Sequence, residues 1–330
     1  MSIKLRSSTY LGLWLGALLL GTMFLLNGCT SNYYRPHQQA YLQVYAANGN
    51  AISIFAVPGN SSGNVNVAPG ATLTGSNTGL DDPHRLTFDS NNNTYITNAA
   101  GNSVTIFSPG STGNVAPVAT ISGSNTGLSG PSGIGLDFQN NIYVANSDGN
   151  SITVYAAGAS GNATPTATIS GSNTGLDFPN GLAIGPGRTI YVANEDGNSI
   201  EIFPESATGN VAPTTTISGS NTLLDGPHDL TVDNFGNIFV VNGAGNSITI
   251  YSPNSTGNVA PVASISGSST GLSNPNGISI DNAGNIYVGN GSAIDIFAAI
   301  PAGAANVAPA VTISGSSTGL TAPIHGIAVY

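Results

Sequence analysis

The stretch that decides the fold reads PSGIGLDFQNNIYVANSDGNSITVY at residues 131–155, followed by TATIS at residues 166–170. Ile142 and Val144 alternate with Tyr143, which is the two-residue period of a β-strand. Clusters of Gly, Asn, Asp and Ser separate four short apolar runs and are typical of tight turns. The stretch therefore predicts a unit of four short strands. These strands are expected at residues 133–137, 141–146, 151–155 and 166–170.

This unit recurs along the chain with a constant period. TISGS or a close variant begins at residue 72 and then every 48 residues as far as residue 312, and a proline follows each copy. A four-stranded repeat of about 40–50 residues is what a blade of a β-propeller requires. The six prolines are Pro83, Pro131, Pro179, Pro227, Pro275 and Pro323.

The two ends of the repeat region hold complementary parts of one blade. Before Pro83 the chain carries three strands, at residues 41–45, 51–55 and 71–73, and after Pro323 it carries only one, at residues 326–330. Pairing residues 326–330 with 41–45 completes a sixth blade and leaves no full edge strand exposed. We therefore expect an all-β fold, a closed six-bladed β-propeller spanning residues 41–330.

The first 28 residues resemble a bacterial lipoprotein signal peptide. Lys4 and Arg6 precede an apolar run of about 16 residues, shorter than the ~20 that span a bilayer, and LNGC at residues 26–29 resembles a lipobox. We expect acylation of Cys29, a flexible tether at residues 29–40, and attachment to the lipid bilayer outside the cytoplasm. Thr30 after the cysteine favours the outer membrane, on its periplasmic or its surface side. The alternative is an uncleaved membrane anchor.

The charge of the chain from Cys29 onward excludes a nucleic-acid partner. Only Arg35, Arg85 and Arg188 are basic against 15 acidic residues, a formal charge of −12, and no lysine remains. Such a surface has no electrostatic attraction to anionic lipids, so the acyl group is expected to be the membrane attachment. Cys29 is the only cysteine, which rules out a disulfide within the chain.

Residues that recur at one position of several blades are interpreted as scaffold. An Asp between the first and second strands can accept backbone N–H bonds from its own turn, and Asn residues around the next hairpin read as turn caps. The scaffold residues are Asp89, Asp137, Asp233 and Asp281; Asn98, Asn146, Asn194, Asn242 and Asn290; and Asn102, Asn150, Asn198 and Asn246.

The position after each proline differs between blades and is the candidate site; in the closing blade one inserted residue, Ile324, separates the proline from this position. The first strand of a blade is innermost and starts at one mouth of the central channel, so these polar residues converge there. The turns between the second and third strands lie on the same face and add Asp148, Glu195 and Asp196. At the next position Arg85 and Asp229 replace glycine. The alternative is a water-filled channel with a polar lining. The candidate ligand-binding residues are His84, Arg85, Ser132, Asn180, His228, Asp229, Asn276 and His325.

Blade spacing limits which of these residues can act together. With blades about 10 Å apart, opposite blades lie about 20 Å apart, so Arg85 and Asp229 are expected not to pair directly. His84 and His325, on neighbouring blades, could share a zinc ion. His84 and His228 face each other across the channel and are expected not to share one without a bridging ligand.

The stretch at residues 131–155 resembles an NHL repeat, and the resemblance covers every blade from residue 41 to 330. NHL-type propellers include binding scaffolds, lyases and lactonase relatives. PNGLAI at residues 179–184 resembles the metal-binding strand of gluconolactonase-type propellers, and PHD at residues 227–229 follows in the next blade. The resemblance implies a metal site of Asn180, His228 and Asp229, although no early strand begins with the Glu of that family. Three histidines also resemble the zinc ligands of NHL-type lyases, on differently spaced blades.

Two functions remain open at this point. The first is a binding or assembly scaffold at the cell envelope, whose partner is a protein or a small polar ligand. The alternative is a metal-dependent lyase or lactonase-type hydrolase at the channel mouth, with Ca²⁺ or Zn²⁺ as the cofactor. The sequence shows no complete catalytic signature, which favours the scaffold. A purely structural surface repeat protein is a third, weaker alternative.

Overall fold

A computed structural model describes residues 41–59, 61–300, 302–320 and 323–330. The apolar run before Cys29, Cys29 itself and the tether at residues 29–40 therefore lie outside the described residues. In the part that the structure covers, no helix has the length and hydrophobicity to cross a membrane.

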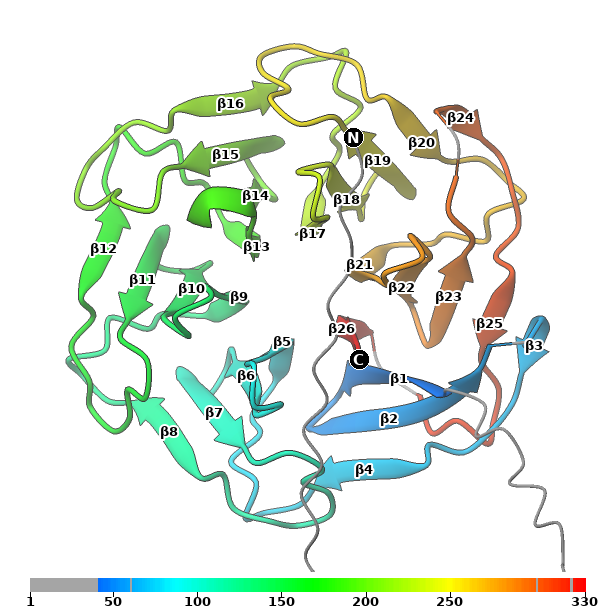
Figure 1. Cartoon of the computed structure of the whole chain (residues 1–330), viewed down its shortest axis with the longest axis horizontal. Coiled ribbons are helices and arrows are strands. Elements are labelled where there is room, and N and C mark those ends of the chain that lie inside the picture. The colour runs from blue at the N-terminus through cyan, green and yellow to red at the C-terminus, as the bar shows by residue number, and fades with distance from the viewer. Residues whose placement is uncertain (1–40, 60, 301, 321–322) are drawn as a thin grey trace, which may run out of the picture. The chain divides into compact units, whose positions relative to one another are not determined.

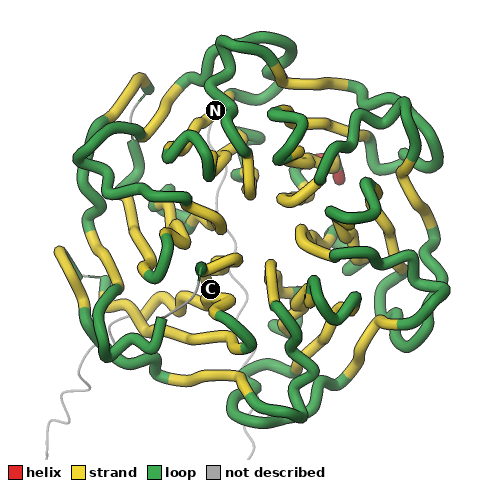
Figure 2. Tube along the Cα trace, turned by 180° about the vertical axis from the view of Figure 1, so that it is seen from behind, coloured by secondary structure: helices red, strands yellow, loops and turns green. Residues whose placement is uncertain are grey.

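Six β-sheets stand around a central axis and form a closed six-bladed β-propeller, as predicted (Figure 1). Each blade runs from an innermost strand to an outermost one, and the outermost strands and their connecting loops form the rim (Figure 2). Blade 1 contains β5 (Pro83–Phe88), β6 (Thr94–Asn98), β7 (Ser103–Phe107) and β8 (Ala119–Ser122). Blade 2 contains β9 (Pro131–Leu136), β10 (Ile142–Asn146), β11 (Ser151–Tyr155) and β12 (Ala167–Ser170).

The next three blades follow the same order. Blade 3 contains β13 (Pro179–Ile184), β14 (Ile190–Asn194), β15 (Ser199–Phe203) and β16 (Thr215–Ser218), with a short 3-10 helix at Pro186–Arg188. Blade 4 contains β17 (Pro227–Val232), β18 (Ile238–Asn242), β19 (Ser247–Tyr251) and β20 (Ala263–Ile265). Blade 5 contains β21 (Pro275–Ile280), β22 (Ile286–Asn290), β23 (Ala293–Phe297) and β25 (Val311–Ile313).

The closing blade joins the two ends of the propeller in sequence. It contains β26 (Ile324–Val329), β1 (Tyr41–Asn48), β2 (Ala51–Pro58) and β4 (Ala71–Thr74). The predicted closure is confirmed, but the register differs: Val329 pairs with Val44, and Tyr330 exchanges two backbone hydrogen bonds of 3.0 Å with Gln43. Residues 326–330 therefore pair with 43–47 and not with 41–45, because β1 extends three residues beyond the predicted strand.

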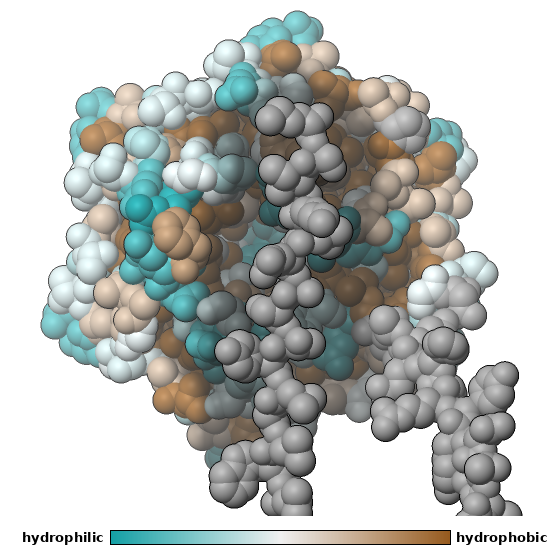
Figure 3. All heavy atoms as spheres, in the orientation of Figure 1, coloured by the Kyte–Doolittle hydropathy of each residue, from teal (hydrophilic) through white to brown (hydrophobic). Residues whose placement is uncertain are grey.

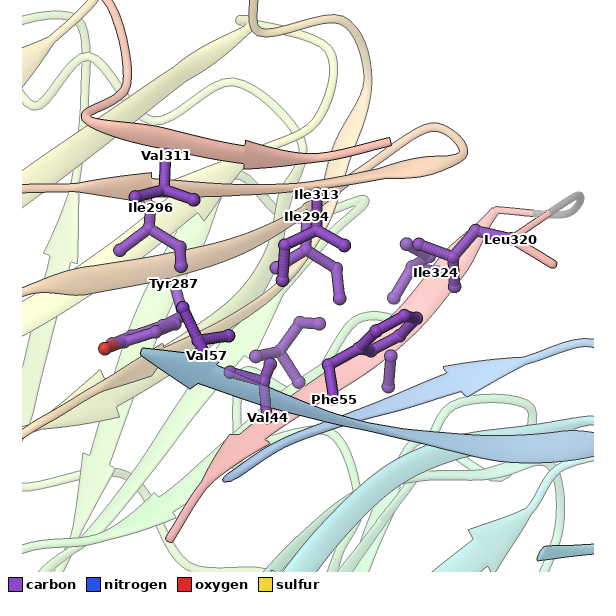
Figure 4. Packing of buried hydrophobic residues seen from close by; sticks show 12 residues of the cluster. Val44, Phe55, Val57, Tyr287, Ile294, Ile296, Val311, Ile313, Leu320 and Ile324 are labelled. Atoms are coloured by element: carbon purple, nitrogen blue, oxygen red, sulfur yellow. The ribbon is translucent and has the colours of Figure 1, made fainter. Parts of the chain in front are cut away.

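Apolar residues fill the space between neighbouring blades. Figure 4 shows the contact of blade 5 with the closing blade, where Val44 and Phe55 pack against Ile294 and Ile313. These side chains are at most 1% exposed, and burying each one stabilises the fold by about 1.5–3 kcal/mol. The face of the propeller that Figure 3 shows, seen in the orientation of Figure 1, mixes hydrophilic and hydrophobic residues.

A contact that the repeat pattern did not predict joins each blade to the one before it. The loop between the third and fourth strands bonds to the outermost strand of the preceding blade, as where Gly113 N donates to Thr72 O over 2.7 Å. Asn114 in the same loop accepts a 2.7 Å bond from Asn77 N. In two blades the loop forms a short parallel strand. These strands are β3 (Gly63–Val65), on β25, and β24 (Gly303–Ala305), on β20.

The recurring Asp and Asn residues are scaffold, as predicted. Asp89 Oδ1 accepts backbone bonds of 2.9 Å from both Asn91 and Asn93 in its own turn. Asn102 was expected to cap its own hairpin. Its Oδ1 instead accepts a 2.8 Å bond from Gly130 N at the start of the next blade.

Candidate functional site

The innermost strands pack so closely around the channel axis that four of the six have no room for a side chain at the position after the mouth residue. A Cβ atom on Gly133 would lie 2.7 Å from Leu182 N, and one on Gly277 would lie 2.8 Å from His325 O. Both distances are shorter than any ordinary Cβ contact. The repeated glycine after the mouth position therefore allows the inner strands to converge.

Arg85 and Asp229, which replace that glycine in blades 1 and 4, meet at the centre of the ring. Arg85 Nε lies 2.9 Å from Asp229 Oδ2, and both residues are 5% exposed. The expected separation of about 20 Å is therefore wrong for these side chains, because blade spacing does not describe glycine-packed inner strands and the arginine side chain is long. Burial raises the pKa of Asp229, and the Arg85 guanidinium counteracts this rise.

Arg85 also bonds the backbone of three other blades. Its Nη2 donates to the carbonyl oxygens of His228 (3.0 Å) and Asn276 (3.4 Å), and its Nη1 donates to that of His325. Asp229 accepts bonds from the backbone N–H groups of Leu230 and Ile278. Beneath the pair a cavity of about 250 Å³ continues along the inner strands. Arg85 and Asp229 thus hold the centre of the ring together.

Above this pair, hydrogen bonds link polar side chains of four blades. His84 Nδ1 lies 3.1 Å from Ser132 Oγ, and Ser132 Oγ donates to Asn180 Oδ1. Asn180 Nδ2 donates to Glu195 Oε2 over 2.6 Å. At the two ends, His84 Nε2 lies 3.3 Å from Asp82 Oδ2, and His228 Nε2 lies 2.8 Å from Glu195 Oε1. We call these residues the mouth chain: Asp82, His84, Ser132, Asn180, Glu195 and His228.

His325 of the closing blade joins one end of the mouth chain. Its ring stacks on that of His84, with centroids 4.5 Å apart and planes inclined by 6°. One ligand atom each of Asp82, His84 and His325 lies within 4.8 Å of the others, close enough for the three residues to hold a metal ion. We call these three residues the triad. Two imidazoles and a carboxylate are typical zinc ligands.

The other predicted metal site, of Asn180, His228 and Asp229, is not assembled: these three side chains bond to other residues and not to one another. Asp229 pairs with Arg85, whereas Asn180 and His228 both bond to Glu195. Asp229 therefore belongs to the central ion pair, whereas Asn180 and His228 belong to the mouth chain. Asn276 contributes its backbone carbonyl to Arg85.

Burial and neighbouring charged groups shift the pKa values of the titratable residues at the mouth. Burial, together with Arg85 and His325, lowers the pKa of His84 to about 4. Burial and Arg85 also lower the pKa of His325. Burial acts to raise the pKa of Glu195, but the hydrogen bonds from His228 and Asn180 outweigh it and hold this pKa below its ordinary value. At neutral pH the stacked rings are uncharged and Glu195 is ionised.

Asp82 belongs to the site but was not among the residues predicted for it. Asp82 directly precedes Pro83, and the corresponding position holds Gly130, Phe178, Gly226 or Asn274 in the next four blades. The comparison between blades that selected the histidines would have found it. Of the turn acids, Glu195 belongs to the mouth chain, while Asp148 and Asp196 are exposed. Arg188 pairs at 2.5 Å with Glu205, away from the mouth chain.

Comparisons with known proteins agree on the architecture. The sequence profile of the family described as "Lactonase, 7-bladed beta-propeller" matches residues 51–224. That family is described by seven blades, whereas this chain closes with six. A search of curated proteins finds no significant match.

Several solved structures share this fold at low sequence identity. A protein of unknown function from Bacteroides caccae superposes with a TM-score of 0.63 at 8% identity, over 88% of this chain and 99% of its own. A candidate 6-phosphogluconolactonase from Bacteroides fragilis gives 0.58 at 14% identity, over 88% and 98%. A streptogramin B lyase gives 0.50 at 14% identity, over 81% and 88%. At these identities the likeness concerns the fold alone.

Proposed function

Because the chain belongs to the lactonase family of β-propellers, we propose that its channel mouth binds a divalent cation together with a small polar ligand. One observation carries the proposal. The triad stands at one end of the mouth chain and the ionised Glu195, paired with His228, at the other. Titratable groups with shifted pKa values that converge from several strands are typical of a functional site.

The donor atoms of the triad favour Zn²⁺ over Ca²⁺. Two imidazole nitrogens and one carboxylate oxygen are three of the four ligands of an open zinc site, and the fourth position remains for an oxygen of the ligand. Calcium takes six to eight oxygen ligands, which the triad does not supply. The lowered pKa values of His84 and His325 support the same choice, because only an unprotonated imidazole binds a metal.

A metal-dependent lactonase-type hydrolase or lyase is the second candidate function. Family membership and the side chain of Glu195, which is 26% exposed and ionised, favour it. The Glu195 carboxylate would accept a proton from water or substrate, with His228 holding its second oxygen. A metal in the triad would polarise a carbonyl oxygen of the substrate.

We further propose that this site is presented outside the cytoplasm, at the cell envelope, by an acyl group on Cys29. The lipobox-like residues 26–29 and the polar segment at residues 29–40 support this proposal. The bilayer would then bind the acyl group and not the propeller, because the chain from Cys29 onward carries a net negative charge.

The test measures bound zinc by elemental analysis and the thermal shift on adding Zn²⁺ to the metal-free protein. The parent is expected to bind about one zinc per chain and to melt at a higher temperature with it. His84→Ala with His325→Ala should abolish both effects. A parent that binds no zinc and shows no shift would overturn the proposed function. Zinc-dependent hydrolysis of simple lactones that Glu195→Gln abolishes would establish the second candidate.

A further inference from the structure

The direction of every hydrogen bond in the mouth chain follows from the charge of Glu195. An ionised carboxylate only accepts, so Asn180 must turn its amide nitrogen toward Glu195 and its oxygen toward Ser132. Ser132 then donates its single hydroxyl proton to Asn180. Its oxygen is left to accept the remaining bond of the chain, which comes from Nδ1–H of His84.

This direction leaves Nε2 of His84 without a proton. A neutral imidazole carries one N–H, and here that N–H is at Nδ1. The bare Nε2 lies 3.3 Å from the Asp82 carboxylate, which is also an acceptor. Two lone pairs facing each other at this distance repel unless a cation or a proton lies between them. A metal cation bound by both atoms removes this repulsion, and it has His84 Nε2 as its nitrogen ligand and the Asp82 carboxylate as its oxygen ligand.

We propose that the mouth chain is a positioning relay, in which Glu195 fixes the Nδ1–H tautomer of His84 and so presents Nε2, with Asp82 and His325, to a nitrogen-preferring divalent cation such as Zn²⁺. The inference rests on the proposed metal function of the same site. Ser132 and Asn180 are then positioning residues rather than ligands. Partners of this kind, bonded to the second nitrogen of a ligating histidine, orient its ring and raise its basicity.

A reversed relay would close the triad. If the partner of Asn180 donated a hydrogen bond, Asn180 would turn over, Ser132 would donate to Nδ1, and Nε2–H of His84 would point at Asp82. Glu195→Gln introduces such a donor, because His228 Nε2–H occupies the remaining oxygen of the new amide. This substitution changes one atom type at the far end of the chain from His84.

The experiment compares full-length variants by competition for Zn²⁺ with a chromogenic chelator, and by nitrogen NMR of the His84 ring in the metal-free protein. Ser132→Ala removes the middle of the relay, and Glu195→Gln removes its ionised end. The matched control is Ser147→Ala, since buried Ser147 donates to Pro179 O over 2.9 Å and lies outside the mouth chain. His84→Ala reports on the metal site itself, and thermal melts verify that each variant is folded.

We expect zinc affinity to fall by about 10–100-fold in Ser132→Ala and Glu195→Gln, and to stay at the parent value in Ser147→Ala. The NMR spectrum should show Nδ1–H on His84 in the parent and Nε2–H in Glu195→Gln. If His84→Ala binds zinc as tightly as the parent, the proposed metal function fails. If His84→Ala loses zinc while both relay variants keep the parent affinity and tautomer, only the relay is overturned.

Discussion

Arg85 and Asp229 come from opposite blades of the ring, and their side chains meet at its centre with Nε and Oδ2 2.9 Å apart. The same guanidinium bonds carbonyl oxygens of blades 4, 5 and the closing blade. One side chain therefore joins both halves of the propeller beneath the mouth chain. A buried pair of this kind is expensive to break from one side, because the remaining charge is left uncompensated.

Replacing Arg85 with Ala should destabilise the propeller by about 3–5 kcal/mol, since Asp229 stays buried without its cation. Urea denaturation measures the change in the free energy of unfolding. Arg188→Ala is the control: the Arg188 side chain is 23% exposed, and its loss should cost about 0–1 kcal/mol. Equal costs for the two variants would contradict a central role for Arg85.

Gly181→Ala should be destabilising by about 1–3 kcal/mol or more, because the new Cβ would lie 2.7 Å from Asp229 Cα, a backbone atom that cannot move aside alone. Gly70→Ala, where the nearest atom is 3.8 Å away, should stay within about 0.5 kcal/mol of the parent. Thermal melts compare the two variants. An unaffected Gly181→Ala protein would show that the inner strands are packed less tightly than described.

Deleting residues 326–330 should greatly lower the melting temperature. The deletion leaves β1 without its inner partner and removes Ile327, which is 5% exposed. The lost apolar burial alone is worth about 1.5–3 kcal/mol per large side chain. Deleting only Tyr330 removes the two bonds to Gln43 and should have a much smaller effect. Closure through β26 would be refuted by a truncated protein that melts with the parent.

Asp295→Thr should stabilise the protein at neutral pH. Asp295 is 3% exposed, and the equivalent position holds Thr153 and Thr249 in blades 2 and 4. Burial raises the pKa of Asp295, and its bonds to Thr312 and Asn290 only partly offset this. A raised folded pKa gives stability that is present below the unfolded pKa and lost as pH rises through the folded one.

The parent should therefore lose stability relative to Asp295→Thr as the pH rises above about 4, the ordinary carboxyl pKa. Urea midpoints at acid and neutral pH measure this difference. Thr153→Asp is the reciprocal control and should be more costly at neutral than at acid pH. If the two proteins show the same pH dependence, Asp295 titrates alike in the folded and unfolded chains.

Cys29→Ala should move the protein from the membrane fraction to the soluble fraction, because the substitution removes the acylated thiol. Fractionation of cells followed by immunoblotting measures the distribution, and the parent chain processed in parallel is the control. A variant that still pellets with membranes argues against the lipid anchor.

The blades, their number and the closure could be predicted from the sequence because they depend on periodic patterns. Side-chain alternation, as at Ile142 and Tyr143, identifies a strand, and the 48-residue step counts the blades. Residues that depart from the repeat, such as His84 and His228, also indicated the mouth of the channel. The β1–β26 register was missed by two residues, since a strand end shows no periodic signal.

Contacts that depend on distances across the ring were decided only by the tertiary structure. Arg85 and Asp229 pair because glycine backbones such as that of Gly181 allow the inner strands to approach, and no repeat length states how closely backbones pack. The mouth chain likewise requires side chains of four blades at hydrogen-bonding distance. The sequence by itself indicated most residues of the mouth chain and of the central ion pair, although Asp82 was not among them. Folding decided which of them touch, because hydrogen bonds and ion pairs depend on ångström separations between segments far apart in the chain.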